Sequence, residues 1–348
     1  MSIFKHELYL NDVEYVSNLD LDWSKFKDSS ILISGATGLL GSFLVDVIAE
    51  KNEKSGLNCK IYALGRNEEK AKERFVYFDR DYFEFIPYDI NEPLNFKGDK
   101  LDYVVHLASN THPLQYATDP IGTITTNIIG LKNMLDLCVD FNAKRFAFAS
   151  TNEIYGENRG DVELFDEDYS GYINSNTLRA GYPESKRAGE ALCQAYKEQK
   201  GLDVVVPRFT RSYGPTILST DTKAISQFIF KAINNEDIVL KSEGNQYYSY
   251  TYVADAISGL LIILTKGESG EAYNIADLSS DITLKDLAGI IAGQVGKKVV
   301  FELPDEVESK GFSKATKARL DGSKLRSLGW VPRYDIEKGI ERTLEILK

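Results

Sequence analysis

Cysteine and long apolar segments are both scarce in this sequence. Its three cysteines, Cys59, Cys138 and Cys193, lack metal-ligand spacing, so we expect reduced thiols and no metal site. No run of about 18 apolar residues is present that could span a membrane. The polar N-terminus lacks the apolar core of a signal peptide. We therefore predict a cytoplasmic protein with no membrane partner.

Basic residues are fewer than acidic ones. The chain has 41 lysines and arginines against 52 aspartates and glutamates, which gives a formal net charge of -11. Nucleic-acid-binding proteins normally show a basic patch or stripe, so this balance argues against a nucleic-acid partner. An anionic ligand would need help from helix N-termini and from a few well-placed arginines.

What the sequence does contain, from residue 31 onward, is an alternation of short apolar segments and amphipathic ones. Candidate buried strands lie at 31–33, 60–64, 85–88, 103–107, 145–149 and 204–206, and candidate helices at 43–48, 67–75 and 182–197. This alternation predicts an α/β fold with a Rossmann-type, doubly wound parallel sheet. We expect a helical lead-in over 1–28, a Rossmann domain over 29–212, and a smaller mixed α/β lobe over 213–348 that is interleaved with it.

A glycine-rich turn follows the first predicted strand and opens a helix. It reads Gly35-Ala36-Thr37-Gly38-Leu39-Leu40-Gly41. Glycines permit a tight turn, close approach of the backbone to a pyrophosphate, and close packing of helix on strand, while the helix N-terminus offers amide donors to phosphate. The turn predicts a dinucleotide site contacted by Gly35, Thr37, Gly38, Leu39, Leu40 and Gly41. Its glycine spacing resembles the fingerprint of extended short-chain dehydrogenases/reductases.

That resemblance implies further cofactor contacts at later strand ends. They are Asp89, Ile90, Leu107, Ala108, Ser109, Asn127 and Ser150. The second strand ends near Arg66, where NAD-preferring members usually carry an acidic residue for the ribose hydroxyls. A guanidinium there can stack on adenine or pair with a 2′-phosphate. We favour NAD, and NADP is not excluded.

Tyr182 and Lys186 lie four residues apart on a predicted helix, so they share one helical face. A free tyrosine titrates near pH ~10 and is a poor base at neutral pH. A neighbouring ammonium and a positive nicotinamide ring favour the phenolate and lower the pKa of Tyr182. We predict that Tyr182 accepts the proton of a substrate hydroxyl, and that both residues also contact the cofactor.

A second candidate catalytic strip follows the fifth predicted strand, at the sheet edge where such folds bind ligands. Thr151 can bridge the substrate hydroxyl and the Tyr182 phenol. Glu153 can remove or return the proton that a ketone makes acidic on the neighbouring carbon. Thr151, Glu153, Tyr182 and Lys186 are therefore the predicted catalytic residues.

Taken together, these motifs resemble the NAD-dependent epimerase/dehydratase family, and among its members the UDP-glucuronate decarboxylases most. The residues that carry the resemblance are His106-Leu107-Ala108-Ser109, Pro113, Tyr116, Asp119-Pro120, Thr126-Asn127, Gly130, Asn174, Arg179-Ala180-Gly181-Tyr182, Lys186-Arg187, Tyr213-Gly214-Pro215, Tyr252-Val253-Ala254-Asp255 and Leu328-Gly329-Trp330. The resemblance implies a nucleotide-sugar substrate bound by the 213–348 lobe, and a homodimer paired through about 115–140 and 182–197. Candidate substrate contacts are Ser109, Thr151, Asn152, Arg179, Arg211, Gln227 and Tyr248.

Three positions depart from the pattern of these relatives. Asn152 stands where dTDP-glucose 4,6-dehydratases usually carry aspartate, and an amide cannot deliver a proton as a carboxylic acid can. Tyr248 stands where decarboxylases place an arginine, and Arg211 where the family usually has asparagine. We hypothesise that Arg211 takes over binding of the diphosphate or of a substrate carboxylate.

The expected reaction begins with oxidation of the sugar at C4 to a ketone. Decarboxylation follows if C6 is a carboxylate, and return of the hydride regenerates the cofactor. A 4,6-dehydratase and a 4-epimerase are alternatives, because both proceed from the same ketone. An alternative of another class is a non-catalytic nucleotide-sensing protein. The intact set of Thr151, Tyr182 and Lys186 argues against it.

Overall fold

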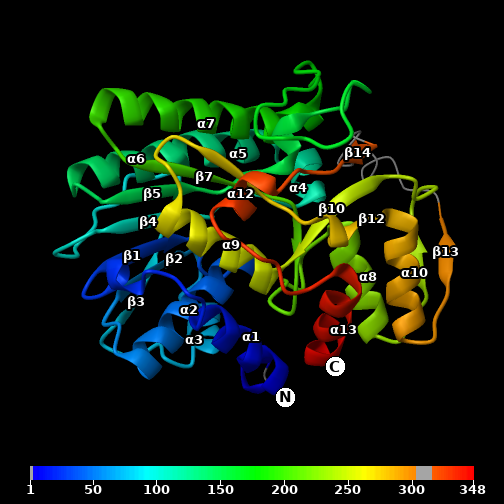
Figure 1. Ribbon diagram of the computed structural model, residues 1–348, viewed down its shortest axis with the longest axis horizontal. Helices are drawn as coiled ribbons and strands as arrows, with labels where there is room; N and C mark the ends of the chain where they lie inside the picture. The colour runs from blue at the N-terminus through cyan, green and yellow to red at the C-terminus, as the bar shows by residue number, and fades with distance from the viewer. Residues whose placement is uncertain (1–2, 303–315) are drawn as a thin grey trace.

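The computed structural model describes residues 3–302 and 316–348, and a large parallel sheet forms its centre (Figure 1). The sheet has eight strands in the order β11-β7-β5-β4-β1-β2-β3, with β6 paired to β7. The strands are β1 (Ser30–Ser34), β2 (Lys60–Gly65), β3 (Phe83–Pro87), β4 (Tyr103–His106), β5 (Arg145–Phe148), β6 (Ser150–Thr151), β7 (Val204–Phe209) and β11 (Ala272–Ile275). Strand order reverses at β1 and β4, and such a switch point opens a ligand crevice at the carboxyl ends of the strands.

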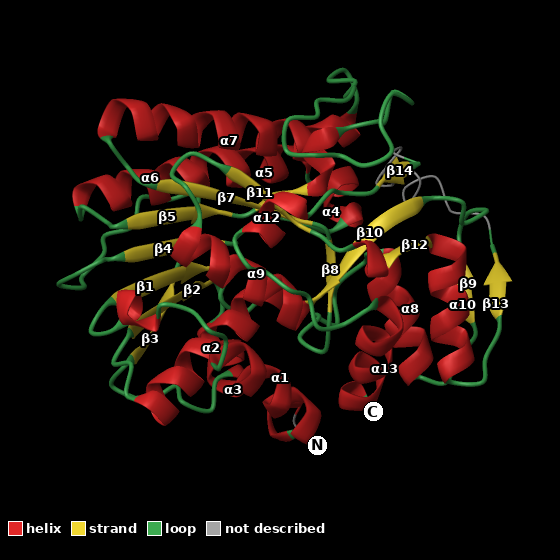
Figure 2. Cartoon of the chain, viewed as in Figure 1, coloured by secondary structure: helices red, strands yellow, loops and turns green. Residues whose placement is uncertain are grey.

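Helices cover both faces of this sheet (Figure 2). On one face lie α1 (Glu7–Ser17), α2 (Leu39–Ser55), α3 (Glu68–Arg74) and α9 (Val253–Lys266), and on the other lie α5 (Pro120–Thr125), α6 (Leu131–Asp140) and α7 (Gly181–Lys200). Successive side chains of β1 therefore enter different cores, because strand residues alternate between faces. Ile31 and Ile33 join one buried cluster and Leu32 joins the other. Burial on both faces explains the apolar runs in the sequence and confirms the predicted fold class.

The remaining strands form two smaller sheets. One contains β8 (Arg211–Tyr213), β10 (Tyr247–Tyr252), β12 (Asp281–Thr283) and β14 (Lys317–Ala318), and the other pairs β9 (Ile238–Leu240) with β13 (Val299–Phe301). Around them lie α8 (Ala224–Ile233), α10 (Leu284–Gln294) and α13 (Ile336–Leu347), while α4 (Pro113–Thr118) and the short α12 (Ser323–Ser327) lie nearer the large sheet. Strand β11 and helix α9 also follow residue 213, yet they belong to the large sheet and its cover.

A buried aspartate links the N-terminal helix to the C-terminal one. Asp12 on α1 is fully buried and accepts hydrogen bonds from Tyr252 at 2.7 Å, from Tyr334 at 2.6 Å and from Arg342 at 2.7 Å. A buried carboxylate needs such partners, because an unpaired one would carry a large desolvation cost. Helix α1 is thereby fixed against both α9 and α13.

Most element boundaries agree with the sequence prediction to within a few residues. The helices predicted at 67–75 and 182–197 are observed as α3 and α7, and the strand predicted at 85–88 begins earlier, at Phe83. Among the features that were not predicted, residues Thr126–Gly130 form η3, a short π-helix. No helix in the described ranges combines the length and apolar character needed to cross a membrane.

Candidate active site

The glycine turn between β1 and α2 has room for backbone only. Gly35 has φ +70, and a Cβ on it would lie 2.9 Å from the backbone nitrogen of Ala108. A Cβ on Gly41 would lie 2.3 Å from the Gly35 carbonyl oxygen. Gly38 is the N-cap of α2 and brings no side chain to its first-turn amides. The turn thus combines close backbone packing with an uncapped helix start, as a pyrophosphate site requires.

The segment after β4 is held beside this turn by a buried hydrogen-bond network. The Ser34 hydroxyl lies 2.7 Å from His106 Nδ1 and accepts a bond from the Ala108 amide at 3.2 Å. Burial lowers the pKa of His106 to about 3, so this imidazole is neutral. The candidates Leu107, Ala108 and Ser109, all partly buried, therefore line the same edge of the sheet as the glycine turn.

The π-helix η3 places Asn127 between that segment and the catalytic helix. The Ser109 hydroxyl donates to Asn127 Oδ1 at 2.7 Å, and Asn127 Nδ2 donates to the Ser185 hydroxyl at 2.9 Å. Ser185 lies on α7 between Tyr182 and Lys186. Asn127 is fully buried, so its bonds are shielded from water and tie the predicted cofactor segment to α7.

Other candidates lie farther out. Arg66 is exposed just after β2, and Asp89 is exposed and accepts a hydrogen bond from the Asn91 amide at 3.0 Å. Ile90 packs against Gly130, where an added Cβ would approach it to 2.8 Å. The Gln227 side-chain amide, on α8, donates a hydrogen bond to the backbone oxygen of Asp221 at 2.7 Å. This contact lies within the 213–348 lobe.

Tyr182 is buried at the start of α7 and stacks on Tyr116, with ring centroids 4.8 Å apart. The Thr151 and Tyr116 side chains lie beside its phenol and lower its pKa. Burial, followed by the Glu153 carboxylate, raises the pKa of Tyr182 above its usual range, against opposing effects of Thr151, Arg179 and Tyr116. The sequence-based expectation of a lowered pKa considered nearby cations only. Burial acts in the other direction and is the largest effect here.

Lys186 lies one helical turn beyond Tyr182 and is also buried. Its Nζ donates to the Ala149 carbonyl at 2.8 Å, and burial lowers the pKa of Lys186 to about 7. Near neutral pH this lysine is therefore only partly protonated. Ala149 comes directly before Ser150, the first residue of β6. Lys186 therefore contacts the chain where the strand that carries Thr151 begins.

Glu153 and Arg179 form an ion pair at 2.5 Å beside this cluster. The Arg179 guanidinium lies over the Tyr116 ring, with Cζ 4.7 Å from its centroid. Thr151 caps the short helix η4 (Asn152–Tyr155) by accepting a hydrogen bond from the Glu153 amide at 3.3 Å. The buried Asn152 lies next to Thr151 at the same edge. Arg179 and Tyr182 thus both contact Tyr116, which the sequence marked only as a family landmark.

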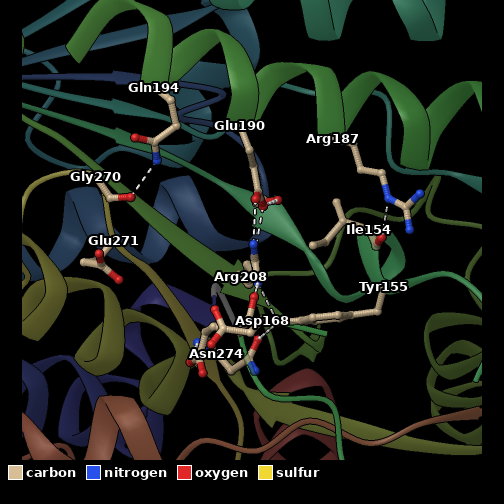
Figure 3. Close-up of polar contacts among 12 residues, drawn as sticks. Ile154, Tyr155, Asp168, Arg187, Glu190, Gln194, Arg208, Gly270, Glu271 and Asn274 are labelled. Carbon is tan, nitrogen blue, oxygen red and sulfur yellow. Dashed lines mark hydrogen bonds and ion pairs between the residues drawn. The ribbon is translucent and has the colours of Figure 1, made fainter. Parts of the chain in front are cut away.

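A buried polar network behind β6 was missed by the sequence prediction (Figure 3). Glu190 on α7 accepts a hydrogen bond from Ser150 and pairs with Arg208 on β7 at 2.7 Å. Arg208 also donates to the Tyr155 phenol at 2.9 Å, and this phenol donates to Asn274 at 2.7 Å. A charged residue inside the apolar run of β7 is the sequence signal that could have indicated a buried partner.

Two of the unusual positions in the sequence meet in space. Arg211 begins β8 and Tyr248 lies on the neighbouring β10. The Arg211 Cζ lies 3.4 Å from the centroid of the Tyr248 ring. Arg211, where the family usually has asparagine, therefore stacks on Tyr248, where decarboxylases place an arginine.

Comparisons with known proteins agree with this arrangement. Residues 31–276 match the family model described as the NAD dependent epimerase/dehydratase family. UDP-glucuronic acid decarboxylase 5 of Arabidopsis thaliana is 31% identical over 91% of this chain and 89% of its own length. UDP-glucuronic acid decarboxylase 1 of Danio rerio is 31% identical over 90% of this chain and 72% of its own length.

Solved structures share the fold. A dTDP-glucose 4,6-dehydratase from Streptomyces venezuelae, solved with NAD bound, superposes with a TM-score of 0.77 at 24% identity, covering 91% of this chain and 96% of that one. A UDP-glucuronic acid 4-epimerase from Bacillus cereus, solved with UDP-glucuronic acid and NAD, gives 0.76 at 22% identity, covering 91% and 98%. At these identities the likeness establishes architecture and leaves the reaction open.

Proposed function

Because this chain belongs to the NAD-dependent epimerase/dehydratase family, we propose that it oxidises a nucleotide-linked uronic acid at C4 and then releases its C6 carboxylate as carbon dioxide. The observation that carries the proposal is the buried Tyr182 phenol, which lies beside Thr151 at the carboxyl edge of the sheet. The curated relatives named UDP-glucuronic acid decarboxylase support this choice among the family's reactions.

The residues at the glycine turn fit a dinucleotide. Added side chains at Gly35 or Gly41 would fill the space that the backbone needs, and the N-terminal amides of α2 lie beside it. We assign the Gly35-to-Gly41 turn to the pyrophosphate and Lys186 to the nicotinamide side. When bound, NAD supplies the acceptor for the C4 hydride and the donor that restores it. Arg66 lies exposed at the end of β2. A direct comparison of the affinities for NAD and NADP tests whether this arginine favours NADP.

Tyr182 and Thr151 handle the C4 proton in this proposal. Thr151 positions the substrate hydroxyl against the phenol, since its own hydroxyl lies beside Tyr182. Burial favours the protonated form of this phenol, so it is ready to donate a proton to a C4 oxygen. To accept one it must first become a phenolate, and a positive charge beside the ring favours that form.

Glu153 and Asn152 favour decarboxylation over dehydration. Loss of water across C5 and C6 needs a base for the C5 proton and an acid for the departing hydroxyl. Glu153 is held by Arg179 at 2.5 Å, and Asn152 carries no acidic proton. A β-keto acid loses carbon dioxide without either group. We therefore rank a 4,6-dehydratase or a 4-epimerase second, and a non-catalytic nucleotide-sensing protein third.

A homodimer is part of the proposal. Ile121, Ile124 and Ile129, on α5 and η3, are 76%, 42% and 43% exposed. Apolar side chains grouped on one surface commonly mark a protein interface. We propose that two copies pair through this face and the adjoining α7 in a cytoplasmic enzyme, and sedimentation of an Ile121→Glu variant as a monomer would support the pairing.

Product analysis tests the reaction. The protein as isolated is incubated with UDP-glucuronate without an added reductant, and the nucleotide product is followed by mass spectrometry and proton NMR. The proposal predicts a product lighter by one carbon dioxide and no net consumption of NAD. UDP-glucose is the matched control, because its C6 alcohol has no carboxylate to lose.

Each other outcome identifies a different assignment. Loss of water identifies a dehydratase, and an unchanged mass with inverted C4 stereochemistry identifies an epimerase. If bound nicotinamide stays oxidised across UDP-, dTDP-, GDP- and CDP-sugars, the protein is a sensor and the proposed chemistry is wrong.

A further inference from the structure

The guanidinium of Arg211 lies flat against an aromatic ring. Its Cζ is 3.4 Å from the Tyr248 ring centroid, and Tyr248 is itself 5% exposed. Stacking uses the face of a guanidinium and leaves its in-plane N–H groups free for an acceptor. The pair therefore presents a fixed fork of donors, whose geometry suits a planar carboxylate.

Arg211 has no counter-charge in residues 3–302 and 316–348. Its Nη1 is buried and without a hydrogen-bond partner. Six other arginines with side chains at most 19% exposed each pair with a carboxylate, namely Arg74, Arg145, Arg179, Arg208, Arg319 and Arg342. A partly buried cation without an anion is costly to maintain, and a ligand anion would offset that cost.

The strand register places Arg211 close to the proposed reaction centre. Phe209 pairs with Thr151 between β7 and β6, and Arg211 is the second residue after Phe209. The Cα atoms of Phe209 and Arg211 are therefore at most roughly 7 Å apart. A hydrogen bond of 2.6 Å between the hydroxyls of Thr210 and Thr251 fixes the backbone between them against β10.

This location determines which of the two substrate anions, the C6 carboxylate or the diphosphate, lies nearer to Arg211. The proposed mechanism puts the C4 hydroxyl at Thr151. In a hexuronic acid, C6 is joined to C5, the direct neighbour of C4, whereas the diphosphate hangs from C1 on the far side of the ring. An arginine on the Thr151 side of the bound sugar is thus nearer to C6 than to the diphosphate.

We propose that Arg211, stacked on Tyr248, binds the C6 carboxylate of a nucleotide-linked uronic acid and so selects uronates over neutral hexoses. The proposal rests on the proposed function for the orientation of the sugar. A bidentate bond between guanidinium and carboxylate contributes about 1.5–3 kcal/mol, which corresponds to about 10- to 100-fold in affinity. Stacking on Tyr248 restricts the rotamers of Arg211 and so holds its N–H donors in one orientation.

Calorimetric titration of the NAD-bound protein carrying Tyr182→Phe, in which turnover is blocked, tests this inference. UDP-glucuronate, UDP-glucose and UDP are titrated into this protein and into the same protein with Arg211→Gln or Arg211→Lys added. We expect Arg211→Gln to weaken UDP-glucuronate about 10- to 100-fold, while UDP-glucose and UDP change less than about threefold. Arg211→Lys keeps the charge without the fork and should fall between the two. Arg333→Gln is the matched control, because Arg333 is exposed and also stacks on a tyrosine, with Cζ 4.4 Å from the Tyr15 ring centroid.

The ligand panel separates the possible results. An equal loss for all three ligands assigns Arg211 to the diphosphate and overturns the proposal, as does an unchanged affinity for UDP-glucuronate. Binding is measured in the Tyr182→Phe background without turnover, so selective loss there, together with no decarboxylation by the wild type, would refute the proposed reaction and leave the carboxylate site standing. If Arg211→Gln fails to fold, Arg211→Lys and Tyr248→Leu supply the same comparison, with selective loss expected in each.

Discussion

Glu190 on α7 and Arg208 on β7 form a two-pronged ion pair directly behind the strand that carries Thr151. The Arg208 Nε and Nη2 lie 3.0 Å and 2.7 Å from the two carboxylate oxygens, and both side chains are largely buried, at 10% and 16% exposed. Glu190 also accepts a hydrogen bond from Ser150. Its charge opposes the lowering of the Lys186 pKa by burial. The pair thus acts on β6 through Ser150 and on Lys186 through its charge.

Glu190 is expected to be a positioning residue for Lys186. Replacing its carboxylate in Glu190→Gln removes a negative charge that raises the pKa of Lys186, so this pKa should fall below about 7. If the reaction needs protonated Lys186, the alkaline limb of the kcat/KM profile moves to lower pH, and kcat at neutral pH drops about tenfold. The measurement is the pH dependence of nicotinamide reduction on addition of UDP-glucuronate. A uniform loss of rate at every pH would indicate a structural role only.

Removing the Tyr182 hydroxyl should slow turnover strongly and leave binding intact. Tyr182→Phe keeps the ring that stacks on Tyr116 but loses the hydroxyl that lies beside Thr151. We expect a fall in the rate of C4 oxidation of roughly 10²- to 10⁴-fold, the usual contribution of a general acid–base group. Single-turnover spectroscopy gives the rate and calorimetry the nucleotide-sugar affinity. Residual activity above a tenth of wild type would remove Tyr182 from the proposed role.

Local patterns in the sequence were enough for the sheet, the glycine turn and the catalytic helix. Gly35, Tyr182 and Lys186 belong to motifs whose spacing within one turn or one helix implies their geometry. The apolar runs of the strands likewise follow from burial on both faces of a parallel sheet. These features depend on neighbours a few residues away along the chain.

The missed features depend on contacts between distant segments. Tyr116 stacks on Tyr182 across 66 positions of sequence, and Glu190 meets Arg208 only because α7 packs behind β6 and β7. The direction of the Tyr182 pKa shift could not be predicted from the sequence either. Burial depends on the whole fold, and its effect on this pKa is larger than that of the cations that the sequence displays. Tertiary packing therefore decides the electrostatics of a site whose members the sequence can name.

The glycine at position 35 should be essential for cofactor binding as well as for stability. In Gly35→Ala, the new Cβ would lie 2.9 Å from the Ala108 nitrogen and the residue would keep φ +70, so the turn must shift. We expect a loss of about 1–3 kcal/mol in the free energy of unfolding and at least tenfold weaker NAD binding. Gly56→Ala is the matched control: its φ is +59, and its Cβ would meet nothing within 4 Å. Equal NAD affinity in the two variants would contradict the assignment of this turn.

The buried Lys186 should make the protein less stable at acidic than at alkaline pH. Burial lowers its pKa in the folded state to about 7 from the usual lysine value of 10.5. Below pH 7 the fold carries the full penalty of a buried charge. As the pH rises from 7 toward 10.5, the folded lysine has released its proton while the unfolded one still holds it. The penalty therefore shrinks, by at most about 1.4 kcal/mol per pH unit.

Lys186→Met removes this titration, so the nucleotide-free variant should be more stable than wild type at pH 6, with a gain that declines steadily toward pH 10. Burial also raises the pKa of Asp255 to about 7. That carboxyl is common to both proteins, and comparing them at each pH cancels its effect. Denaturant unfolding measures the difference, with the exposed Lys97→Met as a control that should show no such trend. A gain that stays constant from pH 6 to pH 10 would mean that Lys186 keeps its proton throughout.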